Sequence, residues 1–167
     1  MELAPALAVG IGLPAVALVI GLVWRARTGR VQRLGGASGI PAGAASAIRP
    51  GATPARSDAE RLQLEPAALG DGATLVQFST EYCSRCPGTA RALVELASEY
   101  DGVRHVEIDL THRADLADAF RVTQTPTVLV LDPSGRAVAR IAGVPRIDEL
   151  RDELDTTTGR SRAIHPV

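Results

Sequence analysis

The pattern of apolar and polar positions divides the 167-residue chain into an apolar start, a polar middle and a globular remainder. The segment 3–24 contains no charged side chain, and as a helix rising about 1.5 Å per residue it would span about 33 Å. The hydrocarbon core of a bilayer is about 30 Å thick, so the pattern predicts one transmembrane helix in an anchor over residues 1–24. A cleaved secretory signal is the alternative, but it needs a positive charge before the apolar run, and Met1-Glu2 supplies none.

Arginines follow this segment, and no basic side chain precedes it. Between Trp24 and Ser57 the chain carries six arginines and no acidic residue. Because positively charged flanks stay on the cytoplasmic side, we expect a single-pass protein of the cell membrane whose N-terminus lies outside and whose C-terminal domain is cytoplasmic. The stretch 25–57 is rich in Arg, Gly, Ala and Pro without apolar periodicity, which predicts a flexible tether next to the lipid bilayer.

Residues 58–155 show the apolar pattern of an α/β domain. Short apolar runs and alternating positions predict strands, which are 73–78, 103–109, 127–131 and 136–141. Apolar residues at helical spacing predict helices, which are about 84–100, 116–120 and 147–154. Strands that alternate with helices predict a sheet covered on both faces, and the last hairpin makes that sheet mixed. The polar tail 156–167 is expected to be loose.

Composition changes this picture in two ways. The predicted domain carries 18 acidic residues against 10 arginines, which argues against a nucleic-acid partner. The whole chain has two cysteines, too few for a structural disulfide framework. No glycine-rich phosphate loop follows a predicted strand, so nothing indicates an organic cofactor.

Both cysteines belong to one C-x-x-C motif, at Cys83 and Cys86, where a buried strand ends and a helix begins. The N-terminus of a helix carries unpaired N–H groups and about half a positive charge, which stabilises a thiolate. We therefore expect Cys83, at the exposed tip, to attack a substrate disulfide and Cys86 to resolve the mixed disulfide. The positive charge of Arg85 between them is expected to lower the pKa of Cys83 further.

Two other interpretations of this motif stay open. The first is a pair of inert buried thiols. The second is a metal-binding or docking module in which the two sulfurs are soft ligands for Cu(I) or Zn(II). Zinc needs four ligands, and the scattered His105, His112 and His165 form no recognisable second pair, so we expect no metal site.

Three stretches together resemble the thioredoxin family in order and spacing: ATLVQFSTEYCSRC, HVEIDLTHR and VTQTPTVLVLDPSGRAVARIAG. The resemblance covers about residues 60–155 and is closest to small actinobacterial thioredoxin-like proteins with an N-terminal membrane segment. It implies the thioredoxin fold and an active-site pair formed by Cys83 and Cys86. It further implies that Thr125-Pro126 is the family's cis-proline, which offers backbone to a substrate chain, and that Gly143 borders the substrate groove.

Several positions depart from the family's pattern. The buried Asp that assists proton transfer from the resolving cysteine falls on Gln77, which cannot titrate. The Lys near that Asp falls on His105, which either substitutes in part for the missing base or is a surface histidine at the strand edge. The two tryptophans that flank the active site fall on Ser79 and Tyr82.

The resemblance implies a membrane-anchored reductase of disulfides in client proteins. Its electrons would come from a donor such as a thioredoxin reductase or a membrane thiol carrier. A cytoplasmic domain favours this direction because thiols in that compartment are kept reduced. If the anchor has the opposite orientation, the alternative is an extracytoplasmic thiol reductase that serves cytochrome maturation.

Overall fold

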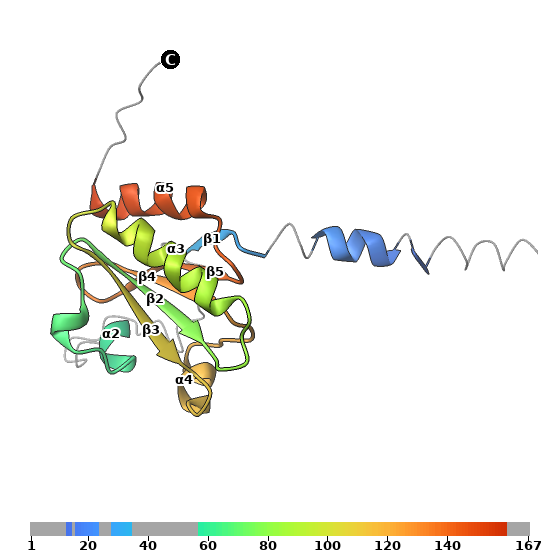
Figure 1. Cartoon of the computed structure of the whole chain (residues 1–167), viewed down its shortest axis with the longest axis horizontal. Coiled ribbons are helices and arrows are strands. Elements are labelled where there is room, and N and C mark those ends of the chain that lie inside the picture. Colours follow the sequence, from blue (N-terminus) through green and yellow to red (C-terminus); the bar gives the residue numbers. More distant parts are fainter. Residues whose placement is uncertain (1–12, 15, 24–27, 35–56, 160–167) are drawn as a thin grey trace, which may run out of the picture.

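The computed structural model describes residues 13, 14, 16–23, 28–34 and 57–159, and its domain is built on a five-stranded sheet in the order β1-β5-β4-β2-β3 (Figure 1). The strands are β1 (Val31–Arg33), β2 (Ala73–Ser79), β3 (Val103–Asp109), β4 (Thr127–Leu131) and β5 (Ala137–Ala142). The helices that follow in chain order are α2 (Asp58–Arg61), the 3-10 helix η1 (Pro66–Ala68), α3 (Cys86–Ser98), α4 (Ala114–Ala119) and α5 (Ile147–Thr158).

The sheet is mixed, as predicted. β2 pairs with β3 in parallel and with β4 in antiparallel orientation, and β4 and β5 form an antiparallel hairpin. All seven residues of β2 are buried, because the strand has a neighbour on each side and helices on both faces. This position explains why its apolar run is almost continuous instead of alternating.

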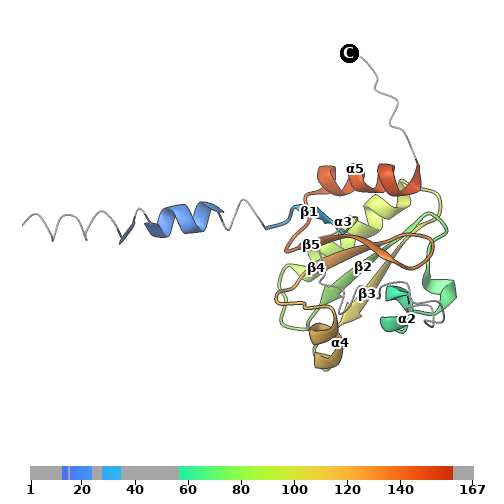
Figure 2. The ribbon, with the colours of Figure 1, turned by 180° about the vertical axis from the view of Figure 1, so that it is seen from behind.

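Helices cover both faces of the sheet (Figures 1 and 2). On one face α3 and α5 bury Leu93 and Leu150 in a cluster with Leu75 of β2. The opposite face is covered by α2 and α4, where Phe120 packs on Phe78 with ring centroids 5.8 Å apart. Consecutive side chains of a strand point to opposite faces, so the same strand supplies both cores. Full burial of each large apolar side chain contributes about 1.5–3 kcal/mol.

Helix α3 begins at Cys86, two residues later than the sequence predicted. Arg85 is its N-cap residue, and Pro87 occupies the first turn, where a missing N–H costs nothing. The later start leaves Cys83 in the connection that follows β2 and makes Cys86 the first residue of the helix.

The segment 28–34 corrects the predicted tether. Val31–Arg33 form β1, an edge strand that pairs antiparallel with β5. Two contacts with α5 also hold it: the N–H of Val31 donates to Glu149 Oε2 at 3.2 Å, and Arg33 Nε donates to Glu153 Oε2 at 2.6 Å. Ladder hydrogen bonds and these ion contacts stabilise the strand, so it needs no apolar alternation of its own. Residues 35–56 of the predicted tether lie outside the described residues.

The predicted transmembrane anchor lies largely outside the described residues. Residues 13, 14 and 16–23 are helical, and none of the helices that the structure describes is both long and apolar enough to cross a bilayer. At the other end α5 continues to Thr158, and Gly159 ends it in the left-handed conformation with φ 71°. Residues 156–158 of the predicted loose tail therefore belong to helix α5. Residues 160–167 lie outside the described part of the chain.

The docking of β1 can be tested through Arg33. The side chain of Glu153 is only 6% exposed, so the substitution Arg33→Ala leaves a largely desolvated charge without this partner. We expect Arg33→Ala to lower the free energy of unfolding by about 1 kcal/mol, measured by urea denaturation. Arg30→Ala is the matched control, because Arg30 is exposed and forms no ion pair with any described residue. Equal midpoints for the two variants would show that this contact does not hold β1.

Candidate active site

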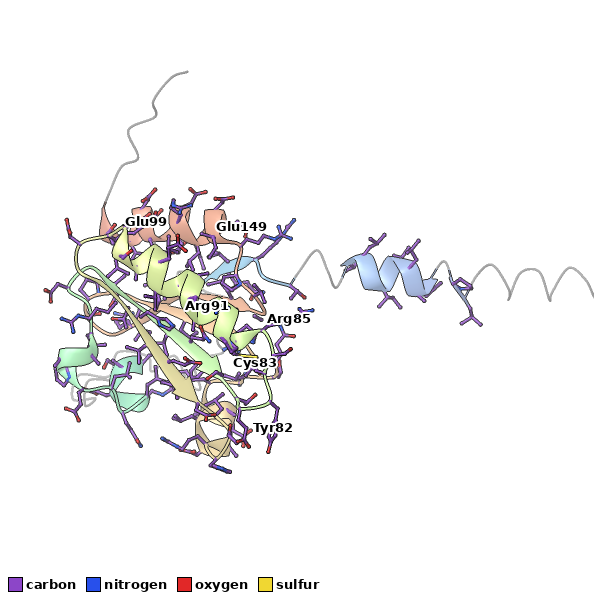
Figure 3. All side chains as sticks on the ribbon, viewed as in Figure 1. Tyr82, Cys83, Arg85, Arg91, Glu99 and Glu149 are labelled. Atoms are coloured by element: carbon purple, nitrogen blue, oxygen red, sulfur yellow. A yellow bond between two sulfur atoms is a disulfide. The ribbon has the colours of Figure 1, made fainter. Side chains whose placement is uncertain are left out.

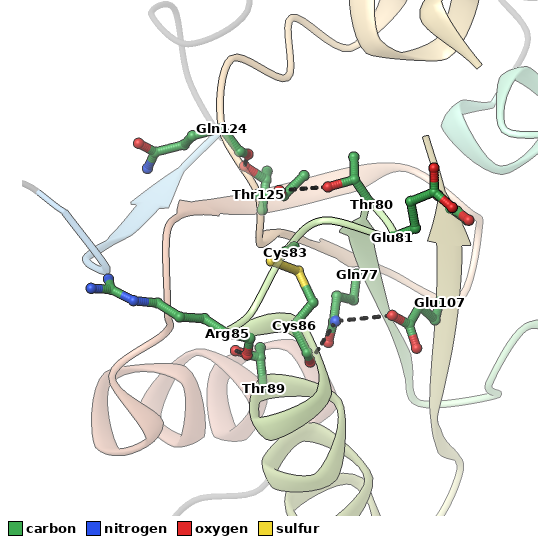
Figure 4. The surroundings of a disulfide bond; sticks show 12 residues. Gln77, Thr80, Glu81, Cys83, Arg85, Cys86, Thr89, Glu107, Gln124 and Thr125 are labelled. Carbon is green, nitrogen blue, oxygen red and sulfur yellow. Dashed lines mark hydrogen bonds between the residues drawn. A yellow bond between two sulfur atoms is a disulfide. The ribbon is translucent and has the colours of Figure 1, made fainter. Parts of the chain in front are cut away.

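Cys83 and Cys86 form a disulfide in the connection from β2 to α3, with Cα atoms 5.4 Å apart (Figures 3 and 4). The N–H of Cys83 donates to the C=O of Thr80 at 3.0 Å, and the N–H of Cys86 donates to the C=O of Cys83 at 3.2 Å. Thr89 donates through both its N–H and its hydroxyl to the C=O of Arg85, each at 3.1 Å. These bonds fix the turn that presents the disulfide at one end of α3.

The two cysteines differ in exposure. Cys86 is 2% exposed. Cys83 is half-buried, and its neighbours Tyr82 and Ser84 are exposed. An incoming disulfide therefore meets the sulfur of Cys83 first, and Cys86 lies behind it at the helix N-terminus. The predicted roles of nucleophile and resolving cysteine fit this difference and stay a prediction.

A groove of about 510 Å³ lies beside the disulfide. It is lined by Thr28, Arg85, Gln124, Thr125, Pro126, Gly143, Val144 and Arg146. The Thr125-Pro126 peptide bond is cis, as the resemblance implied. The structure thus brings the predicted substrate-binding residues into one groove with Arg85.

The backbone of Thr125 has hydrogen-bonding groups without a partner among the described residues. The C=O of Pro126 accepts from the N–H of Gly143 at 2.8 Å, whereas the peptide N–H and C=O of Thr125 pair with nothing in the described part of the chain. A polypeptide in extended conformation can use such a free peptide group as an added strand does. Gly143 lines the same groove at a position that has no room for a side chain. Its φ is 90°, and a Cβ there would lie 2.5 Å from Thr28 Cγ2.

The segment before β1 forms part of the wall of this groove, which the sequence did not predict. The N–H of Gly29 donates to the C=O of Ala142 at 2.8 Å, and the N–H of Arg146 donates to the C=O of Gly29 at 3.2 Å. Thr28 is thereby held against Gly143. The expected tether thus contributes directly to the groove beside the disulfide.

Arg85 points away from the disulfide and toward the segment that leads into β1 (Figure 4). Its side chain is exposed and lines the groove together with Arg146. Arg146 also forms an ion pair with Glu149 at 3.0 Å. That Arg85 lowers the pKa of Cys83 stays a prediction. The structure places the positive charge of Arg85 in the groove.

A second pocket of about 440 Å³ lies on the other side of the disulfide. It is lined by Ser79, Thr80, Glu81, Cys83, Cys86, Pro87, Glu107 and Asp109. Its ionisable residues apart from the cysteines are all acidic, so the disulfide separates a basic groove from an acidic pocket. Figure 4 shows Arg85 and Glu107 on opposite sides of the sulfur atoms.

Gln77 connects the sheet to the first turn of α3. The side chain is fully buried, and its Nε2 donates to the C=O of Cys86 at 3.1 Å and to Glu107 Oε1 at 3.3 Å (Figure 4). Sequence reasoning identified Gln77 as a missing acid but overlooked Glu107. The signal for Glu107 was available only in the register of β2 and β3, which pairs it directly with Gln77.

His105 lies on the same strand as Glu107 but lines a different pocket, with Val94 and Tyr100 among its walls and neither cysteine. Burial lowers the pKa of His105, against the opposing effect of Glu107. Its Nε2 is buried and has no hydrogen-bond partner in the described part of the structure. The ring is half-buried on the edge strand β3, and which of the two interpretations of His105 applies stays a prediction.

The metal-binding alternative gains no support from the geometry. Among the described residues no three His, Cys, Asp or Glu side chains are close enough together to hold a metal ion.

A mixed sheet with a C-x-x-C disulfide at the start of a helix, next to a groove that contains a cis-proline, defines a thiol–disulfide oxidoreductase of the thioredoxin class. The thioredoxin family profile matches residues 65–156. The chain belongs to the thioredoxin family.

Several known thioredoxins are similar to this chain. Thioredoxin H2 of Arabidopsis thaliana is 32% identical over 89 residues, which are 53% of this chain and 62% of that protein. A thioredoxin of Staphylococcus haemolyticus is 32% identical over 88 residues, which are 52% of this chain and 84% of that protein. The solved thioredoxin of Nicotiana alata aligns with a TM-score of 0.49 at 25% identity, over 62% of this chain and 88% of that one.

Proposed function

We propose that this protein reduces disulfides in client proteins, with Cys83 as the nucleophile and Cys86 as the resolving cysteine. The observation that carries the proposal is the difference in exposure of the two sulfurs beside the cis-proline and the unpaired peptide group of Thr125. A client held in extended conformation by that peptide group would bring its disulfide toward Cys83 and not toward Cys86.

The reaction transfers two electrons to the client. The thiolate of Cys83 attacks one sulfur of the client disulfide, and the other client sulfur leaves as a thiolate. Cys86, after losing its proton, attacks Cys83, and the second client thiolate leaves. The protein ends as the Cys83–Cys86 disulfide, and a dithiol donor of the cell must reduce it before the next cycle.

The roles of the two cysteines can be separated by substitution. We expect Cys86→Ser to accumulate mixed disulfides with an oxidised client, because the bond to Cys83 cannot be resolved. Cys83→Ser should trap none, and both variants should lose multiple-turnover reduction of insulin by dithiothreitol. Non-reducing electrophoresis followed by mass spectrometry reads out the adducts. Equal trapping by both variants would reject the assignment.

The charge of the groove supports a preference among clients. Arg85 and Arg146 line it, and among the described residues no acidic side chain does. We propose that the preferred clients carry a carboxylate next to the cysteine that is attacked, because opposite charges at a recognition surface favour specificity and the rate of association.

Matched disulfide peptides with Glu or Lys beside the reactive cysteine test this preference. The wild-type protein should reduce the Glu peptide faster at low salt, and Arg85→Glu should reverse the order. Arg136→Glu makes the same charge change in the β4–β5 turn, away from the groove, and should keep the wild-type order. If both variants keep the wild-type order, Arg85 does not select clients.

The cellular place of the protein is also a proposal. The uncharged segment 3–24 and the arginines that follow it support a single-pass anchor with the domain in the cytoplasm. A membrane-impermeant maleimide applied to intact cells, with the wild-type chain in its reduced form, should then label Cys83 only after permeabilisation. Labelling before permeabilisation would place the domain outside the cell and favour the extracytoplasmic reductase.

A further inference from the structure

We infer that the carboxylate of Glu107 accepts the proton that Cys86 releases when it resolves a mixed disulfide. The inference rests on the proposed function and names a group that acts within it. The acid that the family's pattern places on β2 is replaced here by Gln77, and a carboxylate stands opposite it on the neighbouring strand β3.

Strand register places this carboxylate. β2 and β3 pair in parallel with Gln77 directly opposite Glu107, and Gln77 Nε2 donates to Glu107 Oε1 at 3.3 Å. The same amide nitrogen donates to the C=O of Cys86 at 3.1 Å. One buried side chain therefore holds the Glu107 carboxylate beside the first residue of α3 (Figure 4).

The orientation of the Gln77 amide follows from its partners. The carboxylate of Glu107 and the C=O of Cys86 are both acceptors, so the amide must turn its nitrogen toward them. Its Oε1 is then buried with no hydrogen-bond partner in the described structure. This orientation points the amide nitrogen at both the Glu107 carboxylate and the backbone of Cys86, and so keeps the two close together.

Glu107 and Cys86 also line the same acidic pocket. A polar pocket of about 440 Å³ has room for water molecules, which can carry a proton between the thiol and the carboxylate. From α3 the pocket is faced by Cys86 and Pro87, neither of which brings a further charge.

The other ionisable groups near the pocket are less suited to this step. Asp109 lines it, but its Oδ1 accepts from the N–H and the hydroxyl of Thr111 at 2.8 and 2.5 Å, which lower its pKa. Glu81 and Glu107 are both exposed, but Glu81 is hydrogen-bonded to the hydroxyl of Tyr82, whereas Glu107 is hydrogen-bonded to the buried Gln77. His105 lines a separate pocket. Of the described ionisable groups that line this pocket, Glu107 is the one linked through Gln77 to the backbone of Cys86.

The step balances without an added reductant. The thiol of Cys86 gives its proton to Glu107, and the resulting thiolate attacks the sulfur of Cys83 in the mixed disulfide. The client thiolate leaves, and the Cys83–Cys86 disulfide forms. Glu107 returns its proton to solvent or to the departing thiolate.

The test is a single-turnover reaction of the prereduced, full-length protein with an aromatic disulfide that releases a coloured thiolate at each step. The first release reports the attack by Cys83, and the second reports resolution by Cys86. We expect Glu107→Gln to leave the first phase unchanged and to slow the second about tenfold at pH 7. Above about pH 9 the deficit should vanish, because a cysteine thiol ionises without help in that range.

A rescue variant separates proton transfer from a structural effect. Gln77→Asp combined with Glu107→Gln restores one carboxylate beside Cys86 from the other strand, and the second phase at pH 7 should return to within about twofold of wild type. Glu95→Gln is the matched control, since it removes the same charge from an exposed position of α3 that lines neither the groove nor the acidic pocket, and it should leave both phases unchanged.

Each outcome decides something. A pH-independent deficit, a deficit in both phases or failure of the rescue would overturn the role of Glu107. An unchanged second phase in Glu107→Gln would also overturn it while leaving the proposed function intact. Loss of the first phase in the wild-type protein would instead contradict the proposed function itself.

Discussion

The site depends on the packing that holds the first turn of α3 against the end of β2. Leu93 and Leu96 of α3 are 0% and 1% exposed in the core over the sheet. Because the helix is fixed along its length, its N-terminal N–H groups lie at one edge of the domain. The same packing brings Cys86 into contact with Gln77 and leaves Cys83 accessible.

The surroundings of the disulfide are divided by charge. Arg85 and Arg146 line the groove in which a client would be held, and Glu107 and Asp109 line the pocket behind the sulfurs. A cationic groove favours the approach of an acidic client, whereas a carboxylate behind the resolving cysteine favours loss of its proton. In this view recognition and proton transfer use opposite sides of the same turn and can be changed independently.

The sequence pattern predicted the strands β2 to β5, the helices α3 and α5, and the cysteine pair. The apolar residues of these elements are buried in the two cores, so their spacing along the chain reflects which positions face a core. The sequence pattern did not predict β1. This strand has three residues at the sheet edge, two of them polar, and it is held by backbone pairing and by Glu149 and Glu153 of α5. Neither contact leaves a periodic signal.

The sequence pattern did not predict that Glu107 lies near Cys86, for a related reason. Its relation to Cys86 arises from the register of two strands and the rotamer of Gln77, not from spacing along the chain. The predicted start of α3 was two residues early, since helical spacing locates a helix better than it locates its first residue. The start of the short helix α2 is marked in the sequence by the capping box that Ser57 and Glu60 form.

The central claim is that Cys83 and Cys86 exchange electrons reversibly as a pair. Equilibration of the full-length protein in glutathione buffers of graded potential, with thiols counted by alkylation and mass spectrometry, measures this most directly. A disulfide reductase built on this pair should show a single two-electron transition between about −200 and −300 mV, with both thiols appearing together. A midpoint well above −200 mV, or thiols that fail to appear together, would contradict a disulfide reductase built on this pair.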